Sequence, residues 1–237
     1  ITAYVISLGF VGSEMFISVS MPTLAIDFYI SMRSPYSYLV TPRLAALTEN
    51  YNLEIKARPV YAIAARDPDW FKTLNPLWMS YFVMDQQRTA KFLGVPFGLP
   101  RPDPIKQDLA TGAIAADQPY IRGLTRLAAA ASETDCSFPL VREVSALIFD
   151  GKVDGWNKGD HLKNAVTRAG LDFDKLDAAI VADPDRYDQI ISANQDAQKS
   201  IGHWGTPLMV YEGEPFFGQD RFDMLQWRLE QDGLTRR

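Results

Sequence analysis

Two serine hydroxyls in the segment Ser-Pro-Tyr-Ser, those of Ser34 and Ser37, stand where polar side chains could do chemistry. The preceding residues, 24–31, alternate apolar with more polar side chains, which is typical of a half-buried strand. Ser34 suits the N-cap of a helix, and Pro35 suits its first position. A strand that leads into a capped helix directs free backbone N–H groups and the positive end of the helix dipole at one small region, which favours an anion.

The Ser34 hydroxyl could donate a hydrogen bond to a thiolate bound in this region. The helix N-terminus would then lower the pKa of the thiol, as it does for cysteine thiols in the same position. The alternative is that Ser34 is only a helix cap. Ser37 is expected to be structural in the first helical turn, and Tyr36 could face either a ligand or the core.

Composition excludes several classes of function. The chain has 237 residues, of which 24 are basic and 29 acidic, so its net charge is −5 and gives no electrostatic argument for nucleic acid or an anionic membrane as a partner. Cys136 is the single cysteine, which excludes an internal disulfide and a cysteine-based metal site. With only His161 and His203, a multi-histidine metal site is excluded too. We predict no metal and, because a lone cysteine fits a reducing compartment, a cytoplasmic location.

We expect residues 1–21 to be an extension that is not part of the fold. The first twenty residues are apolar, but Glu14 interrupts them and no basic region precedes them, which argues against a secretory signal and a membrane span. Met21 followed by Pro22 is typical of a natural start just before the first strand. An additional N-terminal element of the fold is the alternative.

The rest of the chain begins and ends with expected strands. The patterns predict strands over residues 24–31 and 53–58 with a helix over 35–50 between them. Near the end they predict two strands, within 206–212 and 215–218, and an amphipathic helix over 219–233. The middle is predicted to be helical, over residues 68–93, 119–133, 139–150, 157–169, 173–182 and 184–201.

This order predicts an α/β fold, βαβ…ββα, in which the outer parts form one sheet and a large all-helical domain is inserted between them. We place the first part of the sheet domain at residues 22–62, the helical domain at 63–199 and the second part at 200–233. With a proline just ahead of the third strand, the pattern resembles the thioredoxin fold, and the long insertion resembles its DsbA-like branch. Redox members carry Cys-x-x-Cys where this chain has Ser34 and Ser37, so thiol–disulfide exchange by that motif is chemically impossible.

Two segments are similar to those of glutathione-using relatives: Ser-Pro-Tyr-Ser-Tyr-Leu near the start and Gly-Thr-Pro…Phe-Phe-Gly-Gln-Asp-Arg near the end. These relatives are the kappa-class glutathione transferases and the 2-hydroxychromene-2-carboxylate isomerases. The resemblance covers about residues 24–229 in layout and is specific at both ends. The chain departs from the family at its usual Gly-Asn-x-Pro-Pro, whose Asn touches glutathione; Asn75-Pro76 is a candidate for a shifted equivalent.

The resemblance implies glutathione as cofactor, with its thiolate held by Ser34 as the catalytic residue. Thr206 is expected to pair with the cysteinyl part like an added strand, across a cis peptide bond to Pro207. The γ-glutamyl end would lie at Gln219 and Asp220, although an Asp there could equally be a helix cap. The full set of expected glutathione contacts is Ser34, Pro35, Tyr36, Asn75, Thr206, Pro207, Gln219 and Asp220.

Other residues are candidates for binding the substrate and the glycyl end of glutathione. Trp78 and Trp204 could form an aromatic wall for a planar apolar substrate, although core packing is the commoner role of Trp. The expected partners of the glycyl carboxylate are Arg33, Lys72 and Arg221.

The resemblance therefore implies a glutathione-dependent isomerase that acts on an aromatic or conjugated carboxylic acid, as in the catabolism of aromatic compounds. Glutathione thiolate would add reversibly to the conjugated substrate. A kappa-like glutathione transferase or peroxidase is one alternative. A non-catalytic thioredoxin-fold binding protein without redox cysteines is another. Relatives are often dimers, so a homodimer is expected.

Overall fold

The strands form one sheet built from both ends of the chain. The computed structural model describes residues 23–108, 111 and 113–237. Its four-stranded sheet has the order β2-β1-β3-β4, with bounds β1 (Leu24–Ile30), β2 (Leu53–Pro59), β3 (Leu208–Tyr211) and β4 (Glu214–Phe217). β1 is parallel to β2 and antiparallel to β3, and β3 is antiparallel to β4. The thioredoxin-like sheet with an inserted helical region is thus confirmed.

The helices follow the predicted order, and the largest difference lies within residues 63–93. The bounds are α1 (Pro35–Asn50), α2 (Ile63–Arg66), η1 (Trp70–Thr73), α3 (Leu77–Leu93), α4 (Pro119–Ala131), α5 (Ser137–Phe149), α6 (His161–Arg168), α7 (Phe173–Ala182), α8 (Pro184–Ser200), η2 (Gln219–Arg221) and α9 (Phe222–Gln231). The single helix expected over 68–93 is wrong, because η1 ends at Thr73 and α3 begins at Leu77. Pro76 explains the break, because a proline is tolerated at the start of a helix but not in its interior: Pro76 stands at the N-cap of α3, and Leu74 before it is extended.

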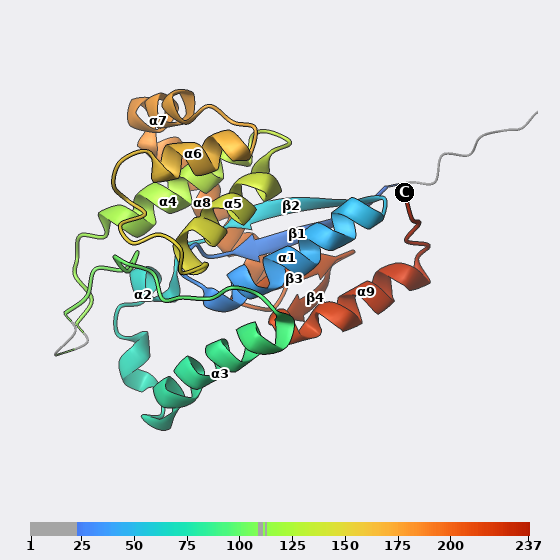
Figure 1. The fold of residues 1–237 in the computed structure, drawn as a ribbon, viewed down its shortest axis with the longest axis horizontal. Coiled ribbons are helices and arrows are strands. Elements are labelled where there is room, and N and C mark those ends of the chain that lie inside the picture. Colours follow the sequence, from blue (N-terminus) through green and yellow to red (C-terminus); the bar gives the residue numbers. More distant parts are fainter. Residues whose placement is uncertain (1–22, 109–110, 112) are drawn as a thin grey trace, which may run out of the picture.

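The two faces of the sheet pack against different helices. In Figure 1, α1 and α9 lie along the sheet, and the alternate β1 residues Ile26, Phe28 and Ile30 are buried in the same cluster as side chains of both helices. The opposite face buries Tyr29 and Leu208 among others, against the residue that follows α8, Ile201. Successive side chains of β1 therefore point alternately into these two cores, which accounts for the period of two that predicted the strand.

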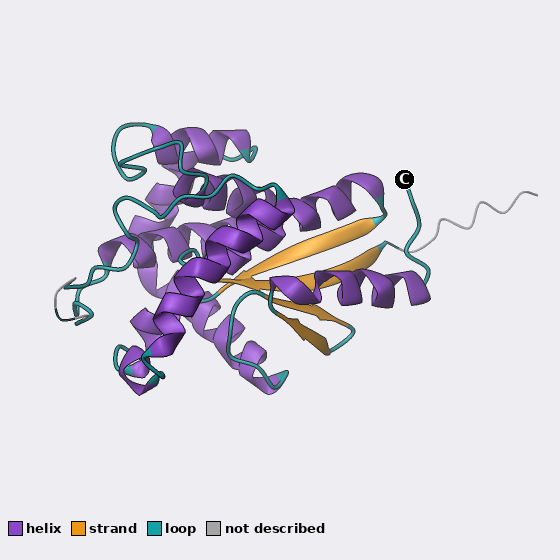
Figure 2. Cartoon of the chain, turned by 60° about the horizontal axis from the view of Figure 1, so that its bottom comes forward, coloured by secondary structure: helices purple, strands orange, loops and turns teal. Residues whose placement is uncertain are grey.

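Helix α8 connects the helical region to both ends of the chain. α4, α5 and α8 all pack against β2, and Figure 2 shows that most of the helical structure lies at one end of the sheet. The Asn194 side-chain N–H donates to the backbone carbonyl of Pro59 at 3.0 Å. One turn later, the Gln198 side-chain N–H donates to the carbonyl of Gly205 at 2.6 Å. The end of β2 and the loop before β3 are therefore held by the same helix.

Three predictions lie beyond what the structure tests. The expected extension, residues 1–21, falls outside the described residues. The homodimer stays a prediction, and so do the domain boundaries. Within the described part of the chain, none of the helices combines the length and apolar character that crossing a membrane requires.

Phe28 should be a main contributor to stability, because its ring is fully buried and joins β1 to Phe138 of α5, with ring centroids 6.3 Å apart. Phe28→Ala is expected to lower the free energy of unfolding by about 3–5 kcal/mol. Urea titration followed by circular dichroism measures this. Val181→Ala is the matched control, since Val181 is 73% exposed, and it should change stability by less than about 0.5 kcal/mol. Equal stability of the two variants would contradict the described core.

Candidate functional site

Ser34 caps α1 as the sequence predicts. Its Oγ accepts from the Ser37 N–H at 3.2 Å, and its carbonyl accepts from the Tyr38 N–H at 3.2 Å. Pro35 has no N–H to offer. The Tyr36 N–H has no hydrogen-bond acceptor within the described part of the chain, so one donor at the positive end of the helix dipole is open to a ligand.

The second predicted anchor lies directly beside this helix start. The Ser34 hydroxyl donates to the carbonyl oxygen of Thr206 at 3.4 Å, although 172 residues separate them, and the Thr206–Pro207 peptide bond is cis as predicted. A bond of 3.4 Å is long for an O–H donor, so the proton can turn to a stronger acceptor. The structure thus brings Ser34, Pro35, Thr206 and Pro207 together.

Tyr36 is turned toward α3. Its hydroxyl donates to the Asp85 carboxylate at 2.5 Å, and its ring meets Phe82 edge-on with centroids 5.5 Å apart. Burial, together with the Asp85 carboxylate, raises the pKa of the Tyr36 phenol far above its usual value, so the hydroxyl stays protonated. Ser37 is fully buried, as expected of a structural residue.

Gln219 and Asp220 form η2 at the entry to α9, next to a concave surface. A cavity of about 400 Å³ is lined by both residues and by Arg43 and Arg88, while Ser34 is not among its lining residues. The Asp220 carboxylate accepts from Arg221 at 3.1 Å. The predicted γ-glutamyl position is therefore accessible, but the cavity itself does not extend to Ser34.

The two predicted pocket tryptophans belong to one aromatic row, which we define as Tyr36, Phe82, Trp78, Trp70 and Trp204. Trp78 stacks on Phe82 with centroids 4.6 Å apart. Trp70 bridges the two predicted residues, at 6.0 Å from Trp78 and 5.6 Å from Trp204. Because Trp204 precedes Thr206 by two residues, the row begins in the Ser-Pro-Tyr-Ser segment and ends beside the cis peptide bond. Sequence reasoning missed Trp70 and Phe82.

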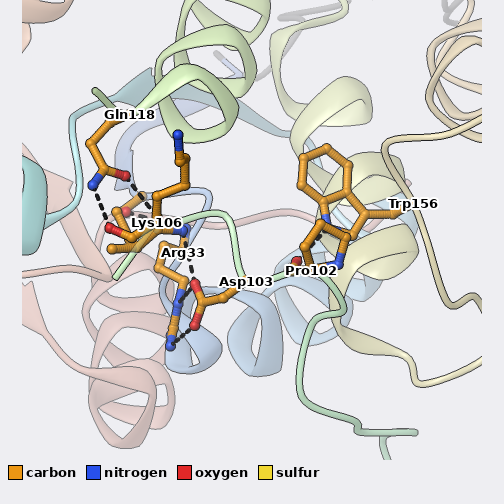
Figure 3. Close-up of polar contacts among 8 residues, drawn as sticks. Arg33, Pro102, Asp103, Lys106, Gln118 and Trp156 are labelled. Carbon is orange, nitrogen blue, oxygen red and sulfur yellow. Dashed lines mark hydrogen bonds and ion pairs between the residues drawn. The ribbon is translucent and has the colours of Figure 1, made fainter. Parts of the chain in front are cut away.

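Arg33, expected to bind a glycyl carboxylate, is already engaged. Figure 3 shows its guanidinium paired with both carboxylate oxygens of Asp103, at 2.6 and 2.7 Å. The segment around Asp103 is itself fixed: the Trp156 indole N–H donates to the Pro102 carbonyl at 2.7 Å, and the amide of Gln118 exchanges hydrogen bonds with the backbone of Lys106. This bidentate pair therefore fixes the loop next to Ser34.

The other expected contacts are engaged as well. Lys72 is paired with Asp69 at 2.6 Å and Arg221 with Asp220 at 3.1 Å. Asn75 is exposed, and its side-chain oxygen accepts from the Leu77 N–H at 2.9 Å at the start of α3. Its role toward glutathione stays a prediction, while locally its side chain closes a turn just before α3, whose N-cap is Pro76.

Arg66 is a cation that sequence reasoning missed. Within the described residues, no carboxylate lies within ion-pair distance of Arg66, and its Nε is buried without an acceptor. Its terminal N–H donates to the carbonyl of Trp204 at 3.1 Å. Burial lowers the pKa of this guanidinium, although arginine stays charged at neutral pH. No local pattern marks Arg66, because its isolation from carboxylates arises only in the tertiary structure.

Comparison with known proteins identifies the family. A family model described as a DSBA-like thioredoxin domain matches residues 25–230, so the chain belongs to this family. No curated protein sequence matches the chain.

Solved structures show the same fold at low identity. A structure of 2-hydroxychromene-2-carboxylate isomerase is 20% identical, with a TM-score of 0.64 over 88% of this chain and 95% of that chain. A probable DsbA oxidoreductase from Streptomyces coelicolor is 15% identical, with a TM-score of 0.61 over 88% and 89%. The cytosolic disulfide reductase DsbM from Pseudomonas aeruginosa with GSH is 15% identical, with a TM-score of 0.51 over 87% and 100%.

The position of the Tyr36 hydroxyl generates a prediction for Tyr36→Phe. The substitution keeps the backbone N–H and the contact with Phe82 but removes the hydrogen bond to Asp85. Because that hydroxyl points to α3, glutathione affinity measured by calorimetry should change by less than about threefold, which is under 1 kcal/mol. A loss of tenfold or more would place the hydroxyl itself on the ligand.

Proposed function

We propose that the chain is a glutathione-dependent isomerase of the 2-hydroxychromene-2-carboxylate isomerase type, acting on an aromatic or conjugated carboxylic acid. The observation that carries the proposal is the contact between the Ser34 hydroxyl and the Thr206 carbonyl at 3.4 Å, beside the open Tyr36 N–H. One hydroxyl donor and one amide donor thus converge at a helix N-terminus. A thiolate is the anion that such a site stabilises when the protein has no cysteine there.

Glutathione would enter with its cysteinyl part along Thr206. Its sulfur would lie at Ser34, whose proton would turn from the Thr206 carbonyl to the thiolate, since a charged acceptor makes the stronger hydrogen bond. The Tyr36 N–H would add a second donor. Both interactions favour the ionised form of the thiol and so lower its pKa.

In the proposed reaction the thiolate adds to the conjugated carbon of the open substrate. The double bond becomes a single bond, about which the intermediate rotates. Expulsion of the thiolate restores the double bond with the other geometry, and the product can close to the cyclic chromene carboxylate. Glutathione is regenerated, and no net oxidation occurs. The addition and expulsion divide one difficult isomerisation into easier steps.

The missing cysteines favour glutathione chemistry over disulfide chemistry. Among the similar structures, one is of 2-hydroxychromene-2-carboxylate isomerase and another is of a disulfide reductase with GSH. Disulfide exchange by the helix-start motif would need cysteines where the chain has Ser34 and Ser37, and the single Cys136 lies at the start of α5.

The first experiment is a glutathione titration by calorimetry, with the thiolate absorbance of bound glutathione followed against pH. The wild type should bind saturably and lower the thiol pKa. Ser34→Ala should raise the pKa of bound glutathione and slow turnover, while costing about 1 kcal/mol of stability as a lost cap. Ser200→Ala, at the exposed end of α8, is the control and should leave both quantities unchanged. Absence of binding at millimolar glutathione would refute the proposal. Full activity of Ser34→Ala would show that Ser34 acts only as the helix cap of α1.

Product analysis separates the isomerase from a transferase or peroxidase on the same scaffold. With a chromene carboxylate or benzylidene pyruvate as substrate, we expect equilibration of the two isomers and complete recovery of reduced glutathione. Mass spectrometry of the reaction mixture measures both. Accumulation of a stable glutathione conjugate would indicate a transferase, and accumulation of oxidised glutathione would indicate a peroxidase.

A further inference from the structure

Arg66 differs in one respect from Arg33 and Lys72, two of the cations expected to bind a carboxylate. Arg33 and Lys72 each have a carboxylate partner, at 2.6 Å in both cases. Arg66 has none within the described part of the chain, and its Nε has no acceptor there. A partly buried guanidinium without a carboxylate keeps part of a desolvation cost, which an incoming anion would offset.

Arg66 also has a defined position relative to the aromatic row. Its terminal N–H is bonded to the carbonyl of Trp204 at 3.1 Å, which fixes it to the loop two residues before Thr206. The Trp204 side chain is 47% exposed and contacts the ring of Trp70. An exposed indole on the loop before β3 and an unneutralised guanidinium at the end of α2 are therefore joined through the backbone of Trp204, two residues before Thr206.

We propose that Arg66 and the exposed ring of Trp204 form a subsite for the carboxylate and adjoining ring of a planar aromatic acid. The ring of the ligand packs on Trp204, and its carboxylate accepts from the terminal Nη–H groups of Arg66, because the Nε is enclosed by protein. The assignment to a substrate rests on the proposed function. The binding itself does not, because it requires neither glutathione nor Ser34.

The same arrangement gives the subsite its selectivity. A carboxylate satisfies the charge of Arg66, whereas an amide of the same shape leaves it unneutralised. Apolar contact with Trp204 is the same for both ligands. We therefore expect discrimination between acid and amide to depend on residue 66, and affinity for both to depend on residue 204.

The test uses trans-cinnamate and the neutral trans-cinnamamide, titrated by calorimetry in the absence of glutathione. The wild type should bind cinnamate saturably and cinnamamide about tenfold or more weakly, as expected for a hydrogen bond to a charged group. Arg66→Met should lower cinnamate affinity to that of cinnamamide and leave cinnamamide unchanged. Arg66→Lys should retain part of the discrimination. Lys175→Met, on the exposed surface of α7, is the control and should behave as wild type.

Three outcomes would overturn the subsite: no cinnamate binding by the wild type at millimolar concentrations, equal affinities for acid and amide, or unchanged cinnamate affinity in Arg66→Met. A parallel loss of both ligands in Arg66→Met would also overturn it, because that pattern indicates a displaced Trp204 loop. Since glutathione is absent, failure of the glutathione titration and failure of this subsite are separate results.

Discussion

The site depends on one constraint: the N-terminus of α1 must meet the loop that precedes β3. β1 leads into α1, and β1 pairs antiparallel with β3 in a register that sets Tyr29 opposite Leu208. The end of β1 and the start of β3 therefore lie side by side at the same end of the sheet, which is why Ser34 reaches Thr206. A slip of this pairing by one residue would turn every side chain of β3 to the other face of the sheet. Because both faces are buried, packing opposes such a slip and so preserves the contact between the Ser34 hydroxyl and Thr206.

Charge distribution narrows what the site can bind. The guanidinium of Arg33, next to Ser34, is neutralised by Asp103, and the ammonium of Lys72 in η1 is neutralised by Asp69. What remains is a set of uncharged donors at the helix start and the cation of Arg66. These donors have little net attraction for a highly charged ligand. They suit one singly charged anion at the helix start and another at Arg66, such as a thiolate and a carboxylate.

Local sequence patterns are sufficient to predict much of the fold and part of the candidate site. The period of two in β1, the cap at Ser34 and the proline before β3 are decided by residues close in sequence, and each was predicted. The break in the helix expected over 68–93 was missed because apolar periodicity outweighed the proline signal at Pro76. Arg66 could not be found by any local rule, since its isolation depends on which carboxylates the fold places elsewhere. The same holds for Trp70, whose contacts with Trp78 and Trp204 join segments far apart in sequence.

The amides of α8 have a consequence for how this protein can change. Asn194 and Gln198 supply donors to the buried Pro59 and Gly205, one in each half of the sheet domain. Removal of the helical region to obtain a minimal thioredoxin domain would leave these two carbonyls without donors, at the places where the chain enters and leaves that region. The insertion is therefore not a detachable module. Sequence changes that reshape the outer helices of the insertion are tolerable. Helix α8, however, must keep Asn194 and Gln198 where they reach the carbonyls of Pro59 and Gly205.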